Sequence, residues 1–91
     1  MFRVAWLQTA LNELAALWLK ADTALRKSVT TVTHQVDLAL KTAPLEQGES
    51  RANGRRLMFA FPLAILFEVL SESSTVRVLH VRLIKPKKKG P

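Results

Sequence analysis

The second half of the chain carries basic side chains whose chemistry suits a phosphate. Four of them are the arginines Arg51, Arg55, Arg56 and Arg82, and His80 lies two residues before the last. A guanidinium binds phosphate through a planar pair of donors and keeps its charge at physiological pH. Arginines that converge on one surface could hold an RNA backbone, or could stabilise charge developing on a transferring phosphoryl group. The alternative is an ordinary exposed basic surface.

The formal net charge of +7 is confined to this part of the chain. Residues 1–50 hold five basic and five acidic side chains, whereas residues 51–91 hold nine basic and two acidic ones. A one-sided positive field attracts polyanions such as nucleic acid, an acidic protein segment or an anionic membrane. The last seven residues contribute Lys85, Lys87, Lys88 and Lys89, which could equally form a solubilising tail.

Other kinds of catalytic chemistry find little support in the sequence. The absence of cysteine excludes disulfides, cysteine-based zinc sites, iron–sulfur clusters and thiol nucleophiles. His34 and Asp37 could share a helical face, but two ligands do not make a metal site. The three glycines form no phosphate-binding loop. We therefore expect no metal and no cofactor.

The composition is that of a small globular domain. A chain of 91 residues, with 48% hydrophobic and 23% charged residues, can build one hydrophobic core. The longest apolar run, Leu57 to Phe67, is interrupted by Pro62 and is too short to cross a membrane. The N-terminus lacks the basic segment and cleavage site of a secretory signal. We therefore expect a cytoplasmic protein that does not bind a membrane.

A strand and two helices are predicted to precede the basic region. Alternating apolar residues over 1–7 indicate a short strand. Thr9 can then cap a helix whose apolar face holds Leu7, Leu11, Leu14 and Trp18. Asp22 can cap a second helix that Pro44 ends, with the apolar face Leu25, Val29, Val32, Val36 and Leu40. Helices joined by so short a link pack as an antiparallel hairpin.

The remainder of the domain is predicted to be strands. Residues 44–54 have the composition of a loop, and strands follow over 55–61, 63–70 and 75–84. The order β-α-α-β-β-β is that of an α+β domain, in which the helical hairpin packs on one face of a small, mostly antiparallel sheet. This single domain spans residues 1–84, and the basic tail 85–91 is expected to be flexible.

Alternation along the strands predicts which side chains lie on the face away from the helices. Glu68 belongs to that open face, because the apolar residues of its strand share the other face. On the last strand Val76, Val78, His80 and Arg82 fall on one side, and we expect His80 and Arg82 to join Glu68, with Arg56 from the first of the three later strands. Glu68 and His80 could then form an acid–base pair or an ordinary cross-strand pair. A slip of one residue would invert these assignments.

The ordered set of elements resembles the RelE/ParE superfamily of bacterial type II toxin–antitoxin systems. The residues that carry the resemblance are Leu11-Asn12-Glu13-Leu14 with Trp18, Val36 to Leu40, the loop from Pro44 to Arg51, the hairpin from Arg56 to Val69, and Val76 to Val81. The similarity covers about residues 2–84. It implies a small toxin that an acidic antitoxin neutralises. RelE-like members cut mRNA on the ribosome, whereas ParE-like members inhibit DNA gyrase.

Only some of the nuclease residues of RelE-like members have a match in this sequence. Arg56 matches the basic residue of the first strand of the hairpin, but the next arginine falls on Ala64, and a later one falls near Ile84 or Lys85. The chain has no tyrosine to match the C-terminal one. A cutting mechanism would then need His80, Arg82 or the tail lysines to replace the missing residues, and the expected catalytic residues are Arg56, His80 and Arg82. The residues expected to bind the target are Arg51, Arg55, Lys85, Lys87 and Lys88.

The sequence therefore predicts the toxin of a type II toxin–antitoxin pair, whose partner is an acidic antitoxin. The target would be the ribosome and its mRNA, which makes the protein an endoribonuclease, or DNA gyrase, which would be inhibited without any nuclease activity. Two further alternatives are a degenerate, non-toxic protein-binding module and a nucleic-acid-binding protein that uses only its basic tail.

Overall fold

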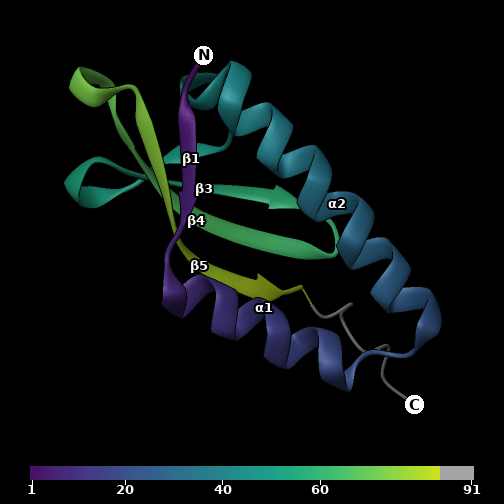
Figure 1. The fold of residues 1–91 in the computed structure, drawn as a ribbon. Helices are drawn as coiled ribbons and strands as arrows, with labels where there is room; N and C mark the ends of the chain where they lie inside the picture. The colour runs from purple at the N-terminus through teal and green to yellow at the C-terminus, as the bar shows by residue number, and fades with distance from the viewer. Residues whose placement is uncertain (85–91) are drawn as a thin grey trace.

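The computed structural model describes residues 1–84, which form two α-helices, three short 3-10 helices and five strands. Figure 1 shows their arrangement. The predicted flexibility of 85–91 therefore lies outside the described residues. The elements follow in the order β1 (Arg3–Trp6), α1 (Gln8–Lys20), α2 (Thr23–Thr42), β2 (Glu49–Ser50), β3 (Arg55–Ala60), β4 (Leu63–Leu70) and β5 (Thr75–Leu83). Among these residues no helix is long and apolar enough to cross a membrane.

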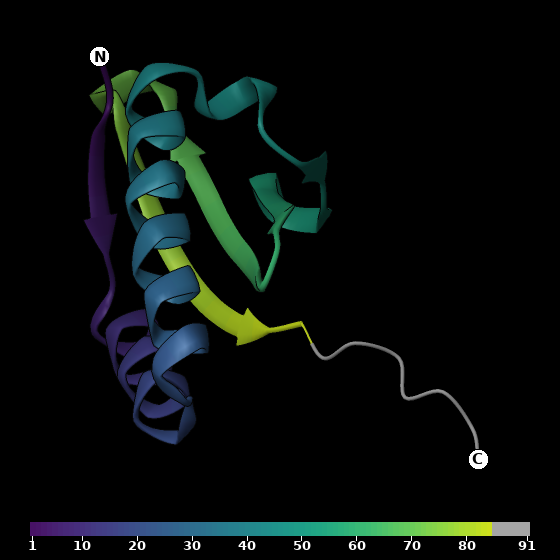
Figure 2. The same ribbon diagram turned by 90° about the vertical axis from the view of Figure 1, so that its right-hand side faces the viewer.

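The five strands form one mixed sheet in the order β1-β5-β4-β3-β2. β1 runs parallel to β5, and every other neighbouring pair is antiparallel. Figure 2 shows α2 lying across one face of this sheet, while α1 follows β1 and lies beside the second half of β5. The α+β class and the mostly antiparallel sheet are thus confirmed. The predicted loop 44–54 also holds a short strand, β2, that composition did not reveal.

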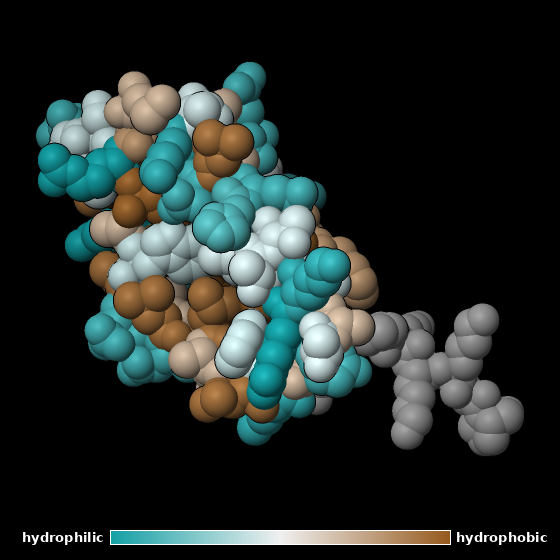
Figure 3. Space-filling view, turned by 45° about the vertical axis from the view of Figure 1, so that its right-hand side comes forward, coloured by the Kyte–Doolittle hydropathy of each residue, from teal (hydrophilic) through white to brown (hydrophobic). Residues whose placement is uncertain are grey.

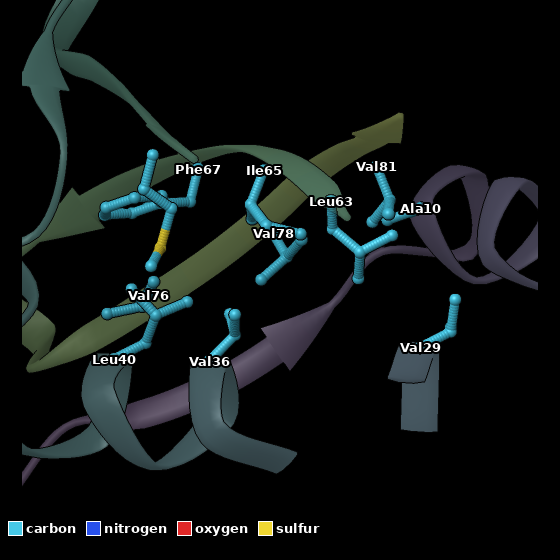
Figure 4. Close-up of a cluster of buried hydrophobic side chains, with 11 residues drawn as sticks. Ala10, Val29, Val36, Leu40, Leu63, Ile65, Phe67, Val76, Val78 and Val81 are labelled. Carbon is cyan, nitrogen blue, oxygen red and sulfur yellow. The ribbon is translucent and has the colours of Figure 1, made fainter. Parts of the chain in front are cut away.

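The core forms where α2 faces β4 and β5. Figure 4 shows side chains of the strands pointing toward those of the helix. Fully buried positions include Val29, Val36 and Leu40 of α2, Leu63, Ile65 and Phe67 of β4, and Val76, Val78 and Val81 of β5. The predicted apolar face of the second helix is confirmed. Its predicted cap is confirmed too, because Asp22 Oδ1 accepts a hydrogen bond from the Leu25 N–H at 2.8 Å.

The first helix differs from its prediction at both its start and its buried face. α1 begins at Gln8, so Thr9 lies inside it, and Leu7 occupies the cap position without a side-chain hydrogen bond. Leu11 and Trp18 are 42% and 39% exposed. The face that packs on the core holds Ala10, Leu14 and Leu17 instead. The sequence offered two adjacent apolar stripes, and the small Ala10 side chain lets the helix approach β5 closely.

A β-bulge in β5 decides which of its residues face the core. Leu66 pairs with His80 and Phe67 pairs with Val78, so Leu79 is an extra residue on the β5 side. The extra residue reverses the alternation, and Val76 and Val78 share the core face with Val81. The prediction that Val76 and Val78 share a face with His80 and Arg82 was therefore wrong. His80 and Arg82 do lie on the face away from the core.

Candidate functional site

The sheet face away from α2 carries three of the candidate functional side chains, Arg55, His80 and Arg82, and we call it the open face. The register places three rows of side chains across β3, β4 and β5 on this face. The first row consists of two arginines with a carboxylate between them. The second row consists of two leucines and a histidine, and the third contains a phenylalanine, an alanine and an arginine. The rows are Arg55–Glu68–Arg77, Leu57–Leu66–His80 and Phe59–Ala64–Arg82.

One carboxylate gathers three consecutive residues of β5 at the edge of this face. Glu13 of α1 accepts a hydrogen bond from the Val81 N–H at 3.0 Å. His80 Nδ1 lies 3.2 Å from each Glu13 oxygen, and Arg82 Nη1 donates to Glu13 Oε2. We call these residues, Glu13 with His80, Val81 and Arg82, the Glu13 cluster.

The cluster follows from the short length of β1. β1 ends at Trp6, which pairs with Val78, so no strand continues along the second half of β5. The Val81 N–H would otherwise lack a partner in the sheet. Instead of a strand, α1 lies beside this part of β5. A side chain of the helix can therefore reach β5, and the Glu13 carboxylate accepts the hydrogen bond of the Val81 N–H. His80 and Arg82, which stand on either side of Val81, meet the same carboxylate.

The electrostatics of the cluster favour an ionised Glu13. Partial burial raises the pKa of the Glu13 carboxyl, but the hydrogen bonds from Arg82, the Val81 N–H and His80 outweigh that effect, so its pKa lies below the usual value. The Glu13 side chain is 22% exposed, whereas those of His80 and Arg82 are 44% and 65% exposed. The carboxylate is therefore sheltered while the two basic groups remain accessible from solvent.

Glu68 pairs with an arginine rather than with the histidine. Arg77 Nη2 and Nε lie 2.6 Å and 3.1 Å from Glu68 Oε1, across β4 and β5. The expected pairing of Glu68 with His80 is thus corrected, because each has another partner. Arg55 stands beside Glu68 in the register and is exposed. Within residues 1–84 its guanidinium makes no hydrogen bond or ion pair.

Arg56 lies on the other face of the sheet, away from His80 and Arg82. It pairs directly with the buried Phe67, so its side chain emerges on the core side. Its guanidinium donates to the carbonyl oxygens of Gln47 at 2.9 Å and Gly48 at 3.1 Å. The expectation that Arg56 shares a face with His80 and Arg82 was wrong, because strand parity depends on a register that the sequence does not reveal. Arg56 fastens the loop before β2.

The remaining predicted target-binding residues fall in the loop or beyond the described chain. Arg51 donates to Glu49 Oε2 and to the Ser50 carbonyl oxygen, both at 3.2 Å, so it braces the turn between β2 and β3. Lys85, Lys87 and Lys88 lie outside the described residues. The structure thus brings together His80 and Arg82, and leaves Arg51 and Arg56 elsewhere.

Two residues of the site were not expected from the sequence, Glu13 and Phe59. Glu13 is one of several polar residues on α1, and nothing in its spacing indicates a contact with a strand 68 positions later. Phe59 is 64% exposed on the open face, although an aromatic residue in a strand usually packs inward. The sequence does hold one indication for Phe59. It is four residues from Arg55 on the same strand, so the two side chains lie on the same face, and a face that carries an arginine is expected to be exposed.

Asp37 contacts a tryptophan of β1 and a lysine of α2. Asp37 accepts a hydrogen bond from Trp6 Nε1 at 3.1 Å and pairs with Lys41 at 2.8 Å. His34 is exposed on α2. No group of three potential metal ligands occurs within residues 1–84. Asp37 therefore ties β1 to α2, and Trp6 is a structural residue.

The opposite side of the molecule carries an apolar groove. It has a volume of about 740 Å³ and lies between the first half of α2, the β3–β4 turn and the end of β5. Leu25, Val32, Phe61 and Leu83 are among its lining residues. Figure 3 shows that this side carries hydrophobic patches between hydrophilic ones. Phe61 is 67% exposed there, so an apolar ring faces solvent at the rim.

Comparisons with known proteins find likeness in structure alone. No family model matches the sequence, and no curated protein matches it either. The fold is similar to the RelBE2 toxin–antitoxin complex of Mycobacterium tuberculosis, with a TM-score of 0.72, 21% identity and 90% of both chains covered. It is similar to the ParDE system of P. aeruginosa, with a TM-score of 0.73, 19% identity and coverage of 93% of this chain and 98% of that one. The isolated E. coli RelE toxin gives a TM-score of 0.64 and 15% identity over 97% of this chain and 89% of that one.

Proposed function

We propose that this chain, which has the fold of the RelE and ParE toxins, is the toxin of a type II toxin–antitoxin pair and acts on RNA through its open face. The observation that carries the proposal is the accessible pair of His80 and Arg82 held on one carboxylate. An imidazole can accept a proton and a neighbouring arginine can bind a phosphate, which are two of the roles that cutting RNA requires.

The proposed reaction is an attack within the RNA chain. His80 Nε2 takes the proton of a ribose 2′-hydroxyl, whose oxygen then bonds to the adjacent phosphorus. The bond from phosphorus to the 5′-oxygen breaks, and that oxygen takes a proton from solvent. Arg82 neutralises charge on the phosphoryl oxygens. The product ends are a 2′,3′-cyclic phosphate and a 5′-hydroxyl.

Further side chains of the open face support RNA as the target. Arg55 and Arg77 extend the basic surface along the neighbouring row, and Phe59 offers an exposed ring on which a base can stack. We keep Arg51 and the lysines Lys85, Lys87 and Lys88 as proposed contacts to the target. Arg56 is assigned to the loop instead of to the reaction, because it emerges on the core side.

The proposed partner is an acidic antitoxin. A chain with a formal net charge of +7 favours an acidic protein by simple attraction. The groove beside Phe61 suits the apolar side of a helix or extended segment of such a partner. We also propose a cytoplasmic location, because both candidate targets, the ribosome with its mRNA and DNA gyrase, are found there.

Induced expression followed by primer extension tests the function. We expect growth arrest, and new cuts in a defined mRNA inside a translating bacterial extract but not in one stripped of ribosomes. His80→Ala should remove the cuts, and His34→Ala is the matched control, because His34 is exposed on α2. Cuts that persist in His80→Ala would contradict the assignment of the proton acceptor.

One observation favours gyrase inhibition as the second candidate. The chain has no tyrosine, so the set of RelE-type nuclease residues is incomplete. Growth arrest with an intact message, together with inhibited supercoiling by purified gyrase, would establish that alternative. Normal growth on induction would instead indicate a degenerate module that only binds its partner.

A further inference from the structure

The Glu13 carboxylate can receive hydrogen bonds from three sources but can give none. An ionised carboxylate has only acceptors, while a backbone N–H and a guanidinium have only donors. The Val81 N–H and Arg82 therefore donate to Glu13. The lowered pKa of Glu13 keeps the carboxyl ionised at neutral pH. His80 Nδ1, 3.2 Å from both oxygens, must then carry a proton if it is to bond.

A neutral imidazole has one proton to place. If that proton is on Nδ1, then Nε2 is the acceptor nitrogen of the ring. His80 points to the open face, where its cross-strand partner is Leu66, and its side chain is 44% exposed. Within residues 1–84, Nε2 makes no hydrogen bond to another group of the protein. The ring that carries this nitrogen is partly exposed on the open face, where the proposed RNA substrate would lie.

We propose that Glu13 is a positioning residue for His80, fixing the tautomer in which Nδ1 is protonated so that Nε2 is presented as the proton acceptor. This inference rests on the proposed function for its use in catalysis, although the tautomer itself does not. When Nε2 takes a proton, the resulting imidazolium remains on a carboxylate, which stabilises the positive charge as it forms.

Within residues 1–84, none of the other charged groups around His80 can accept a hydrogen bond from its Nδ1. Arg82 lies on the same strand and shares the carboxylate. Glu68 of β4 is occupied by Arg77, and Arg55 lies beyond them on β3. Among the described residues Glu13 is therefore the only carboxylate in contact with the His80 ring.

A purely structural role for Glu13 must be distinguished from this one. Glu13 also supplies the acceptor for the Val81 N–H at the sheet edge. Its removal could therefore loosen β5 and slow any reaction without any effect through the imidazole. The test needs a measurement on the ring nitrogens of His80 themselves.

Nitrogen-15 NMR of the two histidine rings provides that measurement. In the wild-type protein, at an alkaline pH at which the imidazole rings are neutral, we expect His80 to have Nδ1 protonated and Nε2 without a proton. In Glu13→Ala it should shift to the Nε2-protonated form that predominates in free imidazoles. His34 serves as the reference ring in the same spectra, and Arg82→Ala, which keeps Glu13, should retain the wild-type tautomer.

Two results would overturn the inference. One is a wild-type His80 in which Nε2 carries the proton, and this measurement does not depend on the folding of any variant. The other is an unchanged His80 tautomer in a folded Glu13→Ala, as judged by the backbone amide spectrum. Both can be obtained whether or not the protein cuts RNA.

The cleavage assay then tests whether the tautomer matters. We expect Glu13→Ala to lower kcat about 10- to 100-fold, because the loss falls on proton transfer. KM should change less, because Arg82 is retained and can still bind phosphate. Full cleavage by a variant whose tautomer has changed would overturn the positioning role. If the wild-type protein cuts no RNA, the proposed nuclease function fails, while the NMR result still decides what Glu13 does to His80.

Discussion

Glu13 joins α1 to β5 through a single carboxylate, and we expect the stability of the fold to depend on its charge. Its hydrogen-bond donors come from His80, Val81 and Arg82, which are consecutive on β5. Charge-assisted hydrogen bonds of this kind are stronger than neutral ones, and a lost charge weakens all of them together. The stability of the fold should therefore report the ionisation of this one residue.

The folded protein should lose the contribution of Glu13 in acid. Because the pKa of Glu13 is lower in the folded chain than its ordinary value of 4.5, the contribution is complete above that value and disappears as the pH falls through the folded pKa. We expect Glu13→Gln to lower the free energy of unfolding by about 1–2 kcal/mol at pH 7. Urea unfolding at pH 7 and pH 3 checks this prediction. An equal difference between the two proteins at both pH values would contradict it.

The candidate site could be predicted from sequence only where local alternation decides the outcome. His80 and Arg82 are two residues apart on one strand, so any register puts them on the same side. Arg56 lies on a different strand, and its side was predicted wrongly because the pairing with Phe67 depends on the whole sheet. Glu13 could not be predicted, because its contact exists only where β1 stops short of Val81.

At the scale of elements, α2 shows how one helix face anchors the sheet. Leu40 is fully buried against β4 and β5, whereas Leu38 on the same helix is 62% exposed. We expect Leu40→Ala to lower the free energy of unfolding by about 2–5 kcal/mol, because it removes packed methyl groups and leaves a cavity. Leu38→Ala, the matched control, should change it by less than about 0.5 kcal/mol. Thermal or urea unfolding compares the two, and similar losses would contradict the burial of this face.

The elements themselves were more predictable than their faces. α2 was evident from the 3–4 spacing between Leu25 and Leu40 and from its Asp22 cap, since both are local signals. The bulge at Leu79 is not local, because it arises where the β4–β5 pairing shifts, and it reversed the side on which Val76 and Val78 lie. β2, with two residues, is too short to show any period.

At the scale of the whole molecule, the basic groups of the open face and the apolar groove lie on different sides. The open face presents Arg55, Arg77 and Arg82 with His80, whereas the α2 side carries the apolar groove beside Phe61. A polyanionic target and an apolar segment of a partner could therefore occupy different surfaces. Electrostatic attraction to RNA would come from both the open face and the lysines of 85–91. The salt dependence of RNA affinity, measured with and without those lysines, distinguishes the two contributions.

Removal of residues 85–91 should weaken RNA binding without abolishing it. The truncation lowers the formal net charge by the four lysines Lys85, Lys87, Lys88 and Lys89. On single-stranded RNA each lost phosphate contact reduces the slope of log affinity against log salt by about 0.7, so the slope should fall by at most about 3. Fluorescence anisotropy over a range of salt concentrations measures it. The remaining affinity should fall further in Arg82→Ala, because that arginine belongs to the open face. If the truncated protein binds no RNA at low salt while its unfolding is unchanged, the tail alone is the nucleic-acid-binding part, and the open face must act on something other than RNA.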